Sequence, residues 1–195
     1  TYRHILTVFA YSTLLSIDLV QDYQAMIGEE ATSPLHDFGK ICVPLEILKK
    51  ASPLTRDERN HLEHHTLAGY ILLCCYAQDT EHISARIARD HHERRTGSGY
   101  PRGIRLEDPI VEIVAVCDIY DALTSQRPYR PQPYDNRSAL EEITLMAERK
   151  EVNWEVVQAL VARNRKGKPH FSDCSVSTDK RGIAPPDNLY GIITP

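Results

Sequence analysis

The sequence predicts an all-α protein folded as a helical bundle. Its strongest periodic segments repeat apolar residues at helical spacing, and they show little of the period-two alternation that marks half-buried strands. Of the 195 residues, 42% are hydrophobic and 26% are charged, which are ordinary values for a globular domain. The length allows one domain and an extension. We therefore expect a helical domain over residues 1–165 and an irregular C-terminal extension over residues 166–195 that lies outside the helical core.

Local sequence signals mark where the helices begin and end. Thr55 and Glu58 form a capping box, the pattern that satisfies free backbone N–H groups at a helix start. A glycine- and proline-rich loop is expected from Gly97 to Gly103. Further along the chain, Pro128 ends the helix predicted over residues 110–125. Four prolines after position 166 oppose a regular element there. The predicted helices cover residues 3–22, 55–77, 81–92, 110–125, 137–149 and 154–164.

Charge and cysteine usage exclude several classes of protein. The net charge of −4 gives no general attraction to nucleic acid or to an anionic membrane, so any phosphate site must be local. The apolar run from Ile5 to Ile17 is far shorter than the roughly 20 residues of a membrane-spanning helix. The five cysteines are an odd number without a CxxC pair. We expect a protein of the reducing cytoplasm, without disulfides or membrane insertion of this segment.

Histidines and aspartates in apolar surroundings predict a metal site. For any one of them, a hydrogen bond within the core or an ion pair with a nearby arginine is the more frequent role. Two doublets, His36–Asp37 and His91–His92, lie on different elements, with His65 and Asp118 on apolar helix faces. Together they favour two adjacent metals, because buried ionised groups are usually paired or bound to metal. Donors without thiolate favour hydrolytic use of Fe, Mn or a similar ion.

The remaining histidines lack such company. No buried doublet or carboxylate accompanies them in the sequence, so solvated side chains are expected. These histidines are His61, His64, His82 and His170.

Five ordered blocks of the sequence resemble the HD-GYP family. His36–Lys40 (HDFGK) is similar to its first signature, and His91–Pro101 (HHERRTGSGYP) is similar to its second. Leu54–Thr55 leads to His65 and Gly69 at the family's spacing, and Asp118–Arg130 (DIYDALTSQRPYR) resembles the third block. The resemblance covers about residues 4–164. It implies an HD-type helical bundle that hydrolyses cyclic di-GMP to linear pGpG, GMP or both, using two or three divalent ions, most often Fe or Mn.

The same resemblance implies roles for single residues. Asp37 would bridge the metals, and Asp37 and Lys40 would be the catalytic residues. The implied metal ligands are His4, His36, Asp37, His65, His91, His92 and Asp118. The implied substrate-binding residues are Lys40, Tyr100, Asp121, Arg127 and Arg130, with Lys40 and the two arginines on phosphate and Tyr100 on guanine or a partner.

Two other functions remain open at the level of sequence. The first is a regulatory module that binds cyclic di-GMP or a diguanylate cyclase domain without turnover. It is favoured by Arg95 and Thr96, which replace the aromatic–Asp pair typical of the family. The second is an HD hydrolase that acts on another cyclic dinucleotide, because no residue in the sequence reads the base unambiguously. A nucleic-acid polymer is not an expected partner.

Overall fold

The computed structural model describes residues 2–20, 34–186, 188–189 and 192–194. Within these ranges the fold is all-α, as the sequence predicts. The helices are α1 (Tyr2–Leu19), α3 (Leu45–Leu48), α4 (Arg56–Glu63), α5 (His65–Ala77), α6 (Ile83–Asp90), α7 (Pro109–Thr124), α8 (Asn136–Glu148) and α9 (Trp154–Asn164). There are also two short 3-10 helices in the described residues, η1 (Phe38–Cys42) and η2 (Phe171–Asp173). Two-residue strands, β1 (Leu54–Thr55) and β2 (Ile193–Thr194), pair in parallel with Leu54 opposite Ile193.

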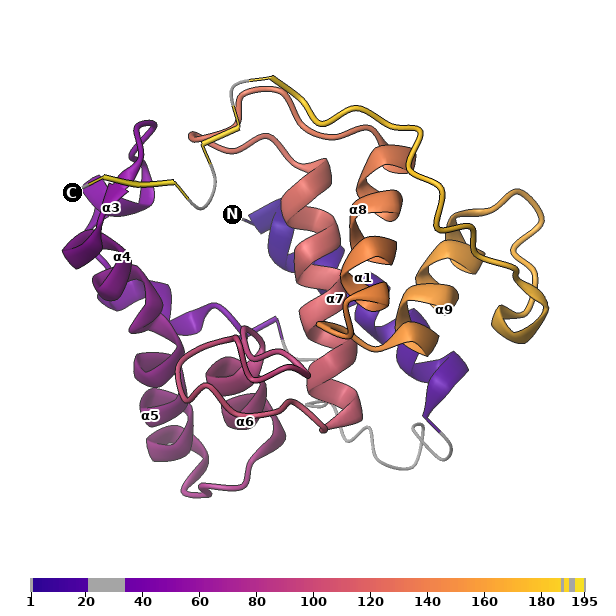
Figure 1. The fold of residues 1–195 in the computed structure, drawn as a ribbon. Coiled ribbons are helices and arrows are strands. Elements are labelled where there is room, and N and C mark those ends of the chain that lie inside the picture. The colour runs from indigo at the N-terminus through magenta and orange to yellow at the C-terminus, as the bar shows by residue number, and fades with distance from the viewer. Residues whose placement is uncertain (1, 21–33, 187, 190–191, 195) are drawn as a thin grey trace.

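The helices form two groups that contact each other through α6 and α7 (Figure 1). Helices α1, α8 and α9 surround α7, whose buried face supplies much of the main core, including Ile113, Val114 and Val116. Helices α5 and α6 pack on each other and on η1 in the second group, around a small cluster of Leu73, Ala85 and Ala88. In the described residues, no helix is both long and apolar enough to cross a membrane.

Capping residues start the helices where the sequence predicts. The hydroxyl of Thr55 accepts a hydrogen bond from the Glu58 N–H, and the Glu58 carboxylate accepts one from the Thr55 N–H, which confirms the capping box. Asp108 caps α7 ahead of Pro109, a residue suited to the first helical position because it lacks an N–H. Asp135 and Asn153 cap α8 and α9 in the same way.

Several helix boundaries differ from the prediction. The single helix expected over residues 55–77 is two helices, α4 and α5, which are separated by a turn at His64. The next helix ends at Asp90, so His91 and His92 lie in the turn that follows it. The first helix ends at Leu19 and is followed by a bend at Val20, and residues 21 and 22 of its predicted span lie outside the described residues.

The C-terminal extension is mostly irregular but not detached. Cys174 is only 1% exposed and belongs to the main core, so the expectation that every residue after 165 lies outside that core is wrong at this position. The amide of Gln158 on α9 donates to its carbonyl. Figure 1 shows the chain running on past α8 to the α3 end of the second group, where β2 pairs with β1.

Candidate metal centre

Seven side chains converge where the two helix groups meet. One glycine contact explains part of this convergence: an added Cβ on Gly39 would lie 1.9 Å from the His65 carbonyl oxygen, so only glycine lets η1 approach α5 this closely. The contact places the residues just before η1 beside the first turn of α5. The seven residues are His4 on α1, His36 and Asp37 before η1, His65 on α5, His91 and His92 after α6, and Asp118 on α7.

Six of these side chains form two groups of three. Within each group, the ligand atoms lie within 4.8 Å of one another. The first group, which we call the α1 group, consists of His4, His36 and Asp118. The second group, which we call the histidine trio, consists of His65, His91 and His92. Each group offers three nitrogen or oxygen donors, so each could hold a divalent ion.

Asp37 lies between the two groups and turns one carboxylate oxygen to each. Its Oδ2 is 3.4 Å from Nε2 of His4 and 3.7 Å from Nε2 of His36. Its Oδ1 is 3.5 Å from Nε2 of His65 and 3.8 Å from Nε2 of His91. A carboxylate in this position can bridge two ions, one held by each group.

Unsatisfied polar atoms at the centre fit a metal site. Asp37 Oδ1, His65 Nε2 and His91 Nε2 are buried and have no hydrogen-bond partner among the described residues. Burying such atoms without a partner is costly, and buried polar groups in folded proteins are nearly always satisfied. These atoms belong to side chains that point at one another from different elements, and coordination to metal would satisfy them.

Hydrogen bonds at the far side of three rings fix their orientation. Nδ1 of His65 lies 2.6 Å from the Leu62 carbonyl oxygen, and Nδ1 of His91 lies 3.0 Å from that of Ile87. Nδ1 of His4 lies 2.5 Å from the Asp121 carboxylate. In His65 and His91 the Nδ1–H donates to an oxygen and leaves the Nε2 lone pair for the centre, as in histidines that bind metal, and the His4 ring is held with its Nε2 in the same direction.

The two groups differ in their protonation. Burial is the main cause that lowers the pKa of His65, of His92 and of His91, the last to about 3, so the histidine trio is neutral at pH 7. Burial also acts against a charge on His4, but hydrogen bonds to Asp118, Asp121 and Asp37 outweigh it and raise the pKa of His4 to about 10. The α1 group therefore holds a proton at neutral pH that an ion would have to displace.

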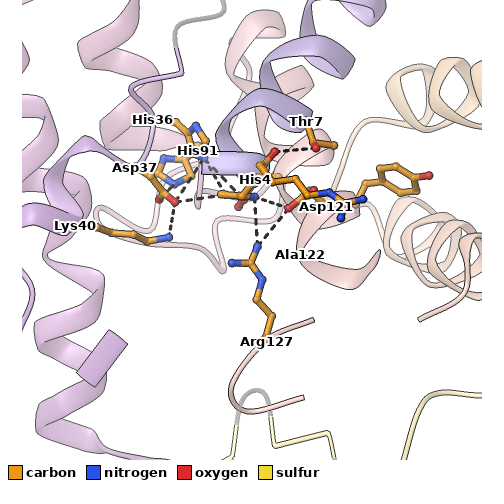
Figure 2. A network of polar contacts seen from close by, with 12 residues as sticks. His4, Thr7, His36, Asp37, Lys40, His91, Asp121, Ala122 and Arg127 are labelled. Carbon is orange, nitrogen blue, oxygen red and sulfur yellow. Dashed lines mark hydrogen bonds and ion pairs between the residues drawn. The ribbon is translucent and has the colours of Figure 1, made fainter. Parts of the chain in front are cut away.

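Lys40 and Arg127 bring positive charge to the rim of the centre (Figure 2). The Lys40 ammonium lies 2.5 Å from Asp37 Oδ2 and its side chain is 33% exposed. Burial raises the pKa of the Asp37 carboxyl, but nearby Lys40 and histidine charges outweigh burial and hold that pKa well below its usual range. Arg127 Nη2 lies 3.3 Å from Nδ1 of His4, and this side chain is 22% exposed. Both cations can therefore reach a ligand from solvent.

The structure places the other expected substrate residues in different surroundings. Arg130 is only 2% exposed, and its Nη2 donates to the carbonyls of Ala122 and Leu123 at the end of α7. Asp121 is buried and holds His4, as described above. Tyr100 is half-buried, and its ring stacks on His92 with 4.6 Å between centroids. Of the substrate residues that the resemblance implies, Lys40 and Arg127 thus have the most accessible charged groups.

Among the histidines expected to be solvated, three are exposed and one is not. His61, His64 and His170 are exposed, in line with the prediction. His82 is half-buried at the start of α6, so the expectation for it is wrong. Sequence reasoning also missed Glu93, a fully buried carboxylate. Its position directly after His92 inside a glycine-containing motif was the available signal.

Comparisons with known proteins agree with this geometry. The HD domain family matches residues 13–153, a stretch that contains every site residue named above except His4. The chain is 47% identical over 103 residues to the cyclic di-GMP phosphodiesterase response regulator RpfG of Xanthomonas campestris pv. campestris (strain 8004), covering 52% of this chain and 27% of that protein. It is 34% identical over 133 residues to 3'3'-cGAMP-specific phosphodiesterase 1 of Vibrio cholerae serotype O1, covering 67% of this chain and 30% of that protein. The chain thus spans less than a third of the length of either relative.

A solved structure has the same fold. Bd1817, an HDG"Y"P protein from Bdellovibrio bacteriovorus, aligns with a TM-score of 0.58 over 80% of this chain and 49% of that one, at 22% identity. The match of the HD domain model over residues 13–153 and this chain's own HDFGK and HHERRTGSGYP motifs lead to one assignment. This chain belongs to the HD domain family and, within that family, to the HD-GYP proteins.

Proposed function

We propose that this chain is the hydrolytic domain of a metal-dependent cyclic di-GMP phosphodiesterase. The observation that carries the proposal is the position of Asp37, with one oxygen facing the α1 group and the other facing the histidine trio. A shared carboxylate between two sets of nitrogen and oxygen donors is suited to a pair of ions acting on one phosphate. The similarity to a cyclic di-GMP phosphodiesterase supports this substrate.

In this proposal each group would hold one ion, and Asp37 would be a ligand shared by the two groups. His4, His36 and Asp118 would hold the first ion, and His65, His91 and His92 would hold the second. Imidazole and carboxylate donors suit Fe and Mn, which are the ions we propose. Bound divalent ions would lower the pKa of a water molecule and neutralise charge on the phosphoryl oxygens.

Lys40 and Arg127 would bind and orient the phosphate. Figure 2 shows the Lys40 ammonium beside Asp37 and the Arg127 guanidinium beside His4, so a phosphate over the centre would be within reach of both cations. Each can donate hydrogen bonds to phosphoryl oxygens and offset charge that grows in the transition state. Their presence beside the ligand cluster gives a local phosphate site in a chain whose net charge is −4.

Two variants test the proposal with the metal-loaded protein. Asp37→Asn keeps the shape of the side chain but removes its negative charge, so metal content and hydrolysis should fall together. Lys40→Met should keep its metals, and turnover should fall by about 10²- to 10³-fold, the usual effect of losing one electrostatic donor. Metals are counted by mass spectrometry, and the products of cyclic di-GMP are separated by chromatography as pGpG and GMP.

The same experiment separates the enzyme from a regulatory module. If the unmutated protein, fully loaded with Fe or Mn, binds cyclic di-GMP without cleaving it, the enzyme proposal fails and a binding module replaces it. Equal loss of metal in Asp37→Asn and Lys40→Met would make Lys40 a structural residue. A diguanylate cyclase domain remains a proposed partner, and binding of a purified cyclase domain in a pull-down would test it.

A second substrate is favoured by one of the relatives. The similarity to a 3'3'-cGAMP-specific phosphodiesterase supports hydrolysis of that hybrid dinucleotide. The two cyclic dinucleotides share the phosphodiester ring and differ in one base, so the phosphate-binding residues would serve both. Comparing kcat/KM for the two substrates decides between them, with preference for cyclic di-GMP expected.

Free thiols at all five cysteines support the cytoplasm as the compartment.

A further inference from the structure

Glu93 is a buried carboxylate surrounded by backbone N–H groups. Its side chain has no exposed surface. Oε1 accepts hydrogen bonds from the N–H of Arg102 at 2.7 Å and of Gly103 at 3.1 Å, and Oε2 accepts one from Ile104 at 3.2 Å. Three consecutive amides therefore converge on a single side chain. A carboxylate is suited to this position because both of its oxygens accept and neither donates.

These hydrogen bonds fold the loop of residues 97–104 back onto the turn that carries His92. An added Cβ on Gly99 would lie 2.3 Å from the His92 carbonyl oxygen and 2.4 Å from the Glu93 Cα, so the two backbone segments touch. The N–H of Tyr100 donates to the same His92 carbonyl at 3.3 Å. The loop is thus fixed at one end by Glu93 and along its middle by His92.

The result of this folding is an aromatic contact on His92. The Tyr100 ring lies nearly parallel to the His92 ring, with 4.6 Å between centroids and 24° between planes. His4, His65 and His91 each have a hydrogen bond to Nδ1 that fixes the ring. In the part of the chain that the structure describes, His92 has no such bond to either ring nitrogen. His92 also lies against the His91 and His65 rings, with 4.0 Å and 5.2 Å between centroids, but both belong to the trio itself. The stack with Tyr100 is therefore the ring contact from outside the trio that can set the plane of His92.

We propose that Glu93 is a positioning residue for the histidine trio, acting through Tyr100. The carboxylate orders the loop, the loop places Tyr100, and Tyr100 holds the His92 ring in the plane in which its nitrogen faces His65 and His91. The inference rests on the proposed metal centre, in which His92 is a ligand. In the described ranges, the Glu93 carboxylate forms no hydrogen bond or ion pair with a member of the ligand cluster, so its effect is indirect.

Replacing Glu93 by glutamine isolates the role of the carboxylate. The glutamine amide is close to the same size, but its NH₂ group donates and cannot accept. One of the two oxygen positions would then face a backbone N–H with a donor, so at least one of the three loop amides would lose its acceptor. Glu141→Gln is the matched control, because Glu141 on α8 also accepts two loop amides, from Arg181 and Gly182, outside the metal centre.

The test measures Mn²⁺ binding to the histidine trio. A His4→Ala background weakens the α1 group, and free Mn²⁺ is followed by electron paramagnetic resonance. We expect Glu93→Gln and Tyr100→Ala to weaken binding about 10- to 100-fold, the usual effect of removing a contact that orients a ligand. Tyr100→Phe, which keeps the ring, and Glu141→Gln should bind as the background does. Hydrogen exchange at residues 102–104 should speed up in Glu93→Gln.

Each outcome decides a different point. If exchange at residues 102–104 speeds up in Glu93→Gln but its Mn²⁺ affinity is unchanged, the positioning role is overturned. If Glu93→Gln does not fold, Tyr100→Ala decides, since it leaves Glu93 and the loop hydrogen bonds in place. If the unmutated protein binds fewer than two ions, the metal centre and the proposed function fail instead. Loss of affinity in Tyr100→Phe would assign the effect to the hydroxyl and overturn the role of the stack.

Discussion

The carboxylate of Asp121 lies 2.5 Å from Nδ1 of His4, and this hydrogen bond joins residues 117 positions apart in the sequence. It ties α1 to α7 and directs Nε2 of His4 towards Asp118, 3.3 Å away. Asp121 is buried, and Arg127 approaches the same oxygen at 3.5 Å. This geometry favours a role for Asp121 in orienting a metal ligand over the direct substrate contact that the resemblance implies.

Asp121→Asn should weaken metal binding at the α1 group. An amide oxygen can still accept the His4 Nδ1–H, but without the negative charge that increases the basicity of the ring. Loss of such a partner usually lowers metal affinity about 10- to 100-fold. Isothermal titration with Mn²⁺ should show one weakened site and one unchanged site, the histidine trio. Asp135→Asn, which changes a helix cap outside the centre, is the control, and equal weakening of both sites would contradict the prediction.

Metal binding should release a proton at the α1 group and not at the histidine trio. The pKa of His4 is raised to about 10, so at pH 7.5 its ring is protonated and must lose that proton to bind an ion. The pKa of His91 is lowered to about 3, so that ring is already neutral. Affinity at the α1 group should rise about tenfold per pH unit below pH 10, while affinity at the trio stays flat.

Calorimetry in two buffers of different ionisation enthalpy measures this proton release. At pH 7.5 we expect about one proton for the ion at the α1 group. His4→Ala should abolish that release and leave the binding heat of the trio independent of the buffer. A binding heat that is the same in both buffers for the unmutated protein would show that His4 is neutral before the ion binds.

Arg127 and Arg130 should have separable effects. Arg130→Gln removes a buried cation from the carbonyls that end α7, and hydrogen bonds to charged groups contribute about 1.5–3 kcal/mol each. The melting temperature should fall by about 4 °C or more. Arg127→Gln should leave the melting temperature within about 2 °C but raise the KM for cyclic di-GMP about tenfold. A raised KM with unchanged stability in Arg130→Gln would contradict this prediction and show that Arg130 binds phosphate, as the resemblance implies.

Local signals predicted the helices well, and long-range contacts account for what the sequence did not predict. The capping box at Thr55 and the proline after Asp108 act over a few residues, so they can be found from sequence alone. The bond between Asp121 and His4 depends on the packing of α1 against α7, which no local pattern encodes.

The candidate site follows the same division. The ligand residues are recognisable because their types recur in doublets, whereas their partners are ordinary polar residues. Glu93 reads as part of a charged turn, and only the folded loop shows that three amides converge on it. Arg130 and Arg127 are alike in the sequence, and they are told apart by burial alone.

Removing the extension after residue 165 should lower stability without changing the metal content. Cys174 is buried in the main core, and Phe171 and Val176 pack against it, so deletion exposes apolar surface on α9. Partial burial of three such side chains contributes about 3 kcal/mol in total, which corresponds to a fall in melting temperature of about 6–12 °C. The ligand residues all lie before residue 119, and metals per chain should therefore match the full chain. Cys174→Ala in the full chain should give a smaller fall, because the rest of the extension stays packed. Loss of metal on deletion would show that the extension is needed to hold the two helix groups together around the centre.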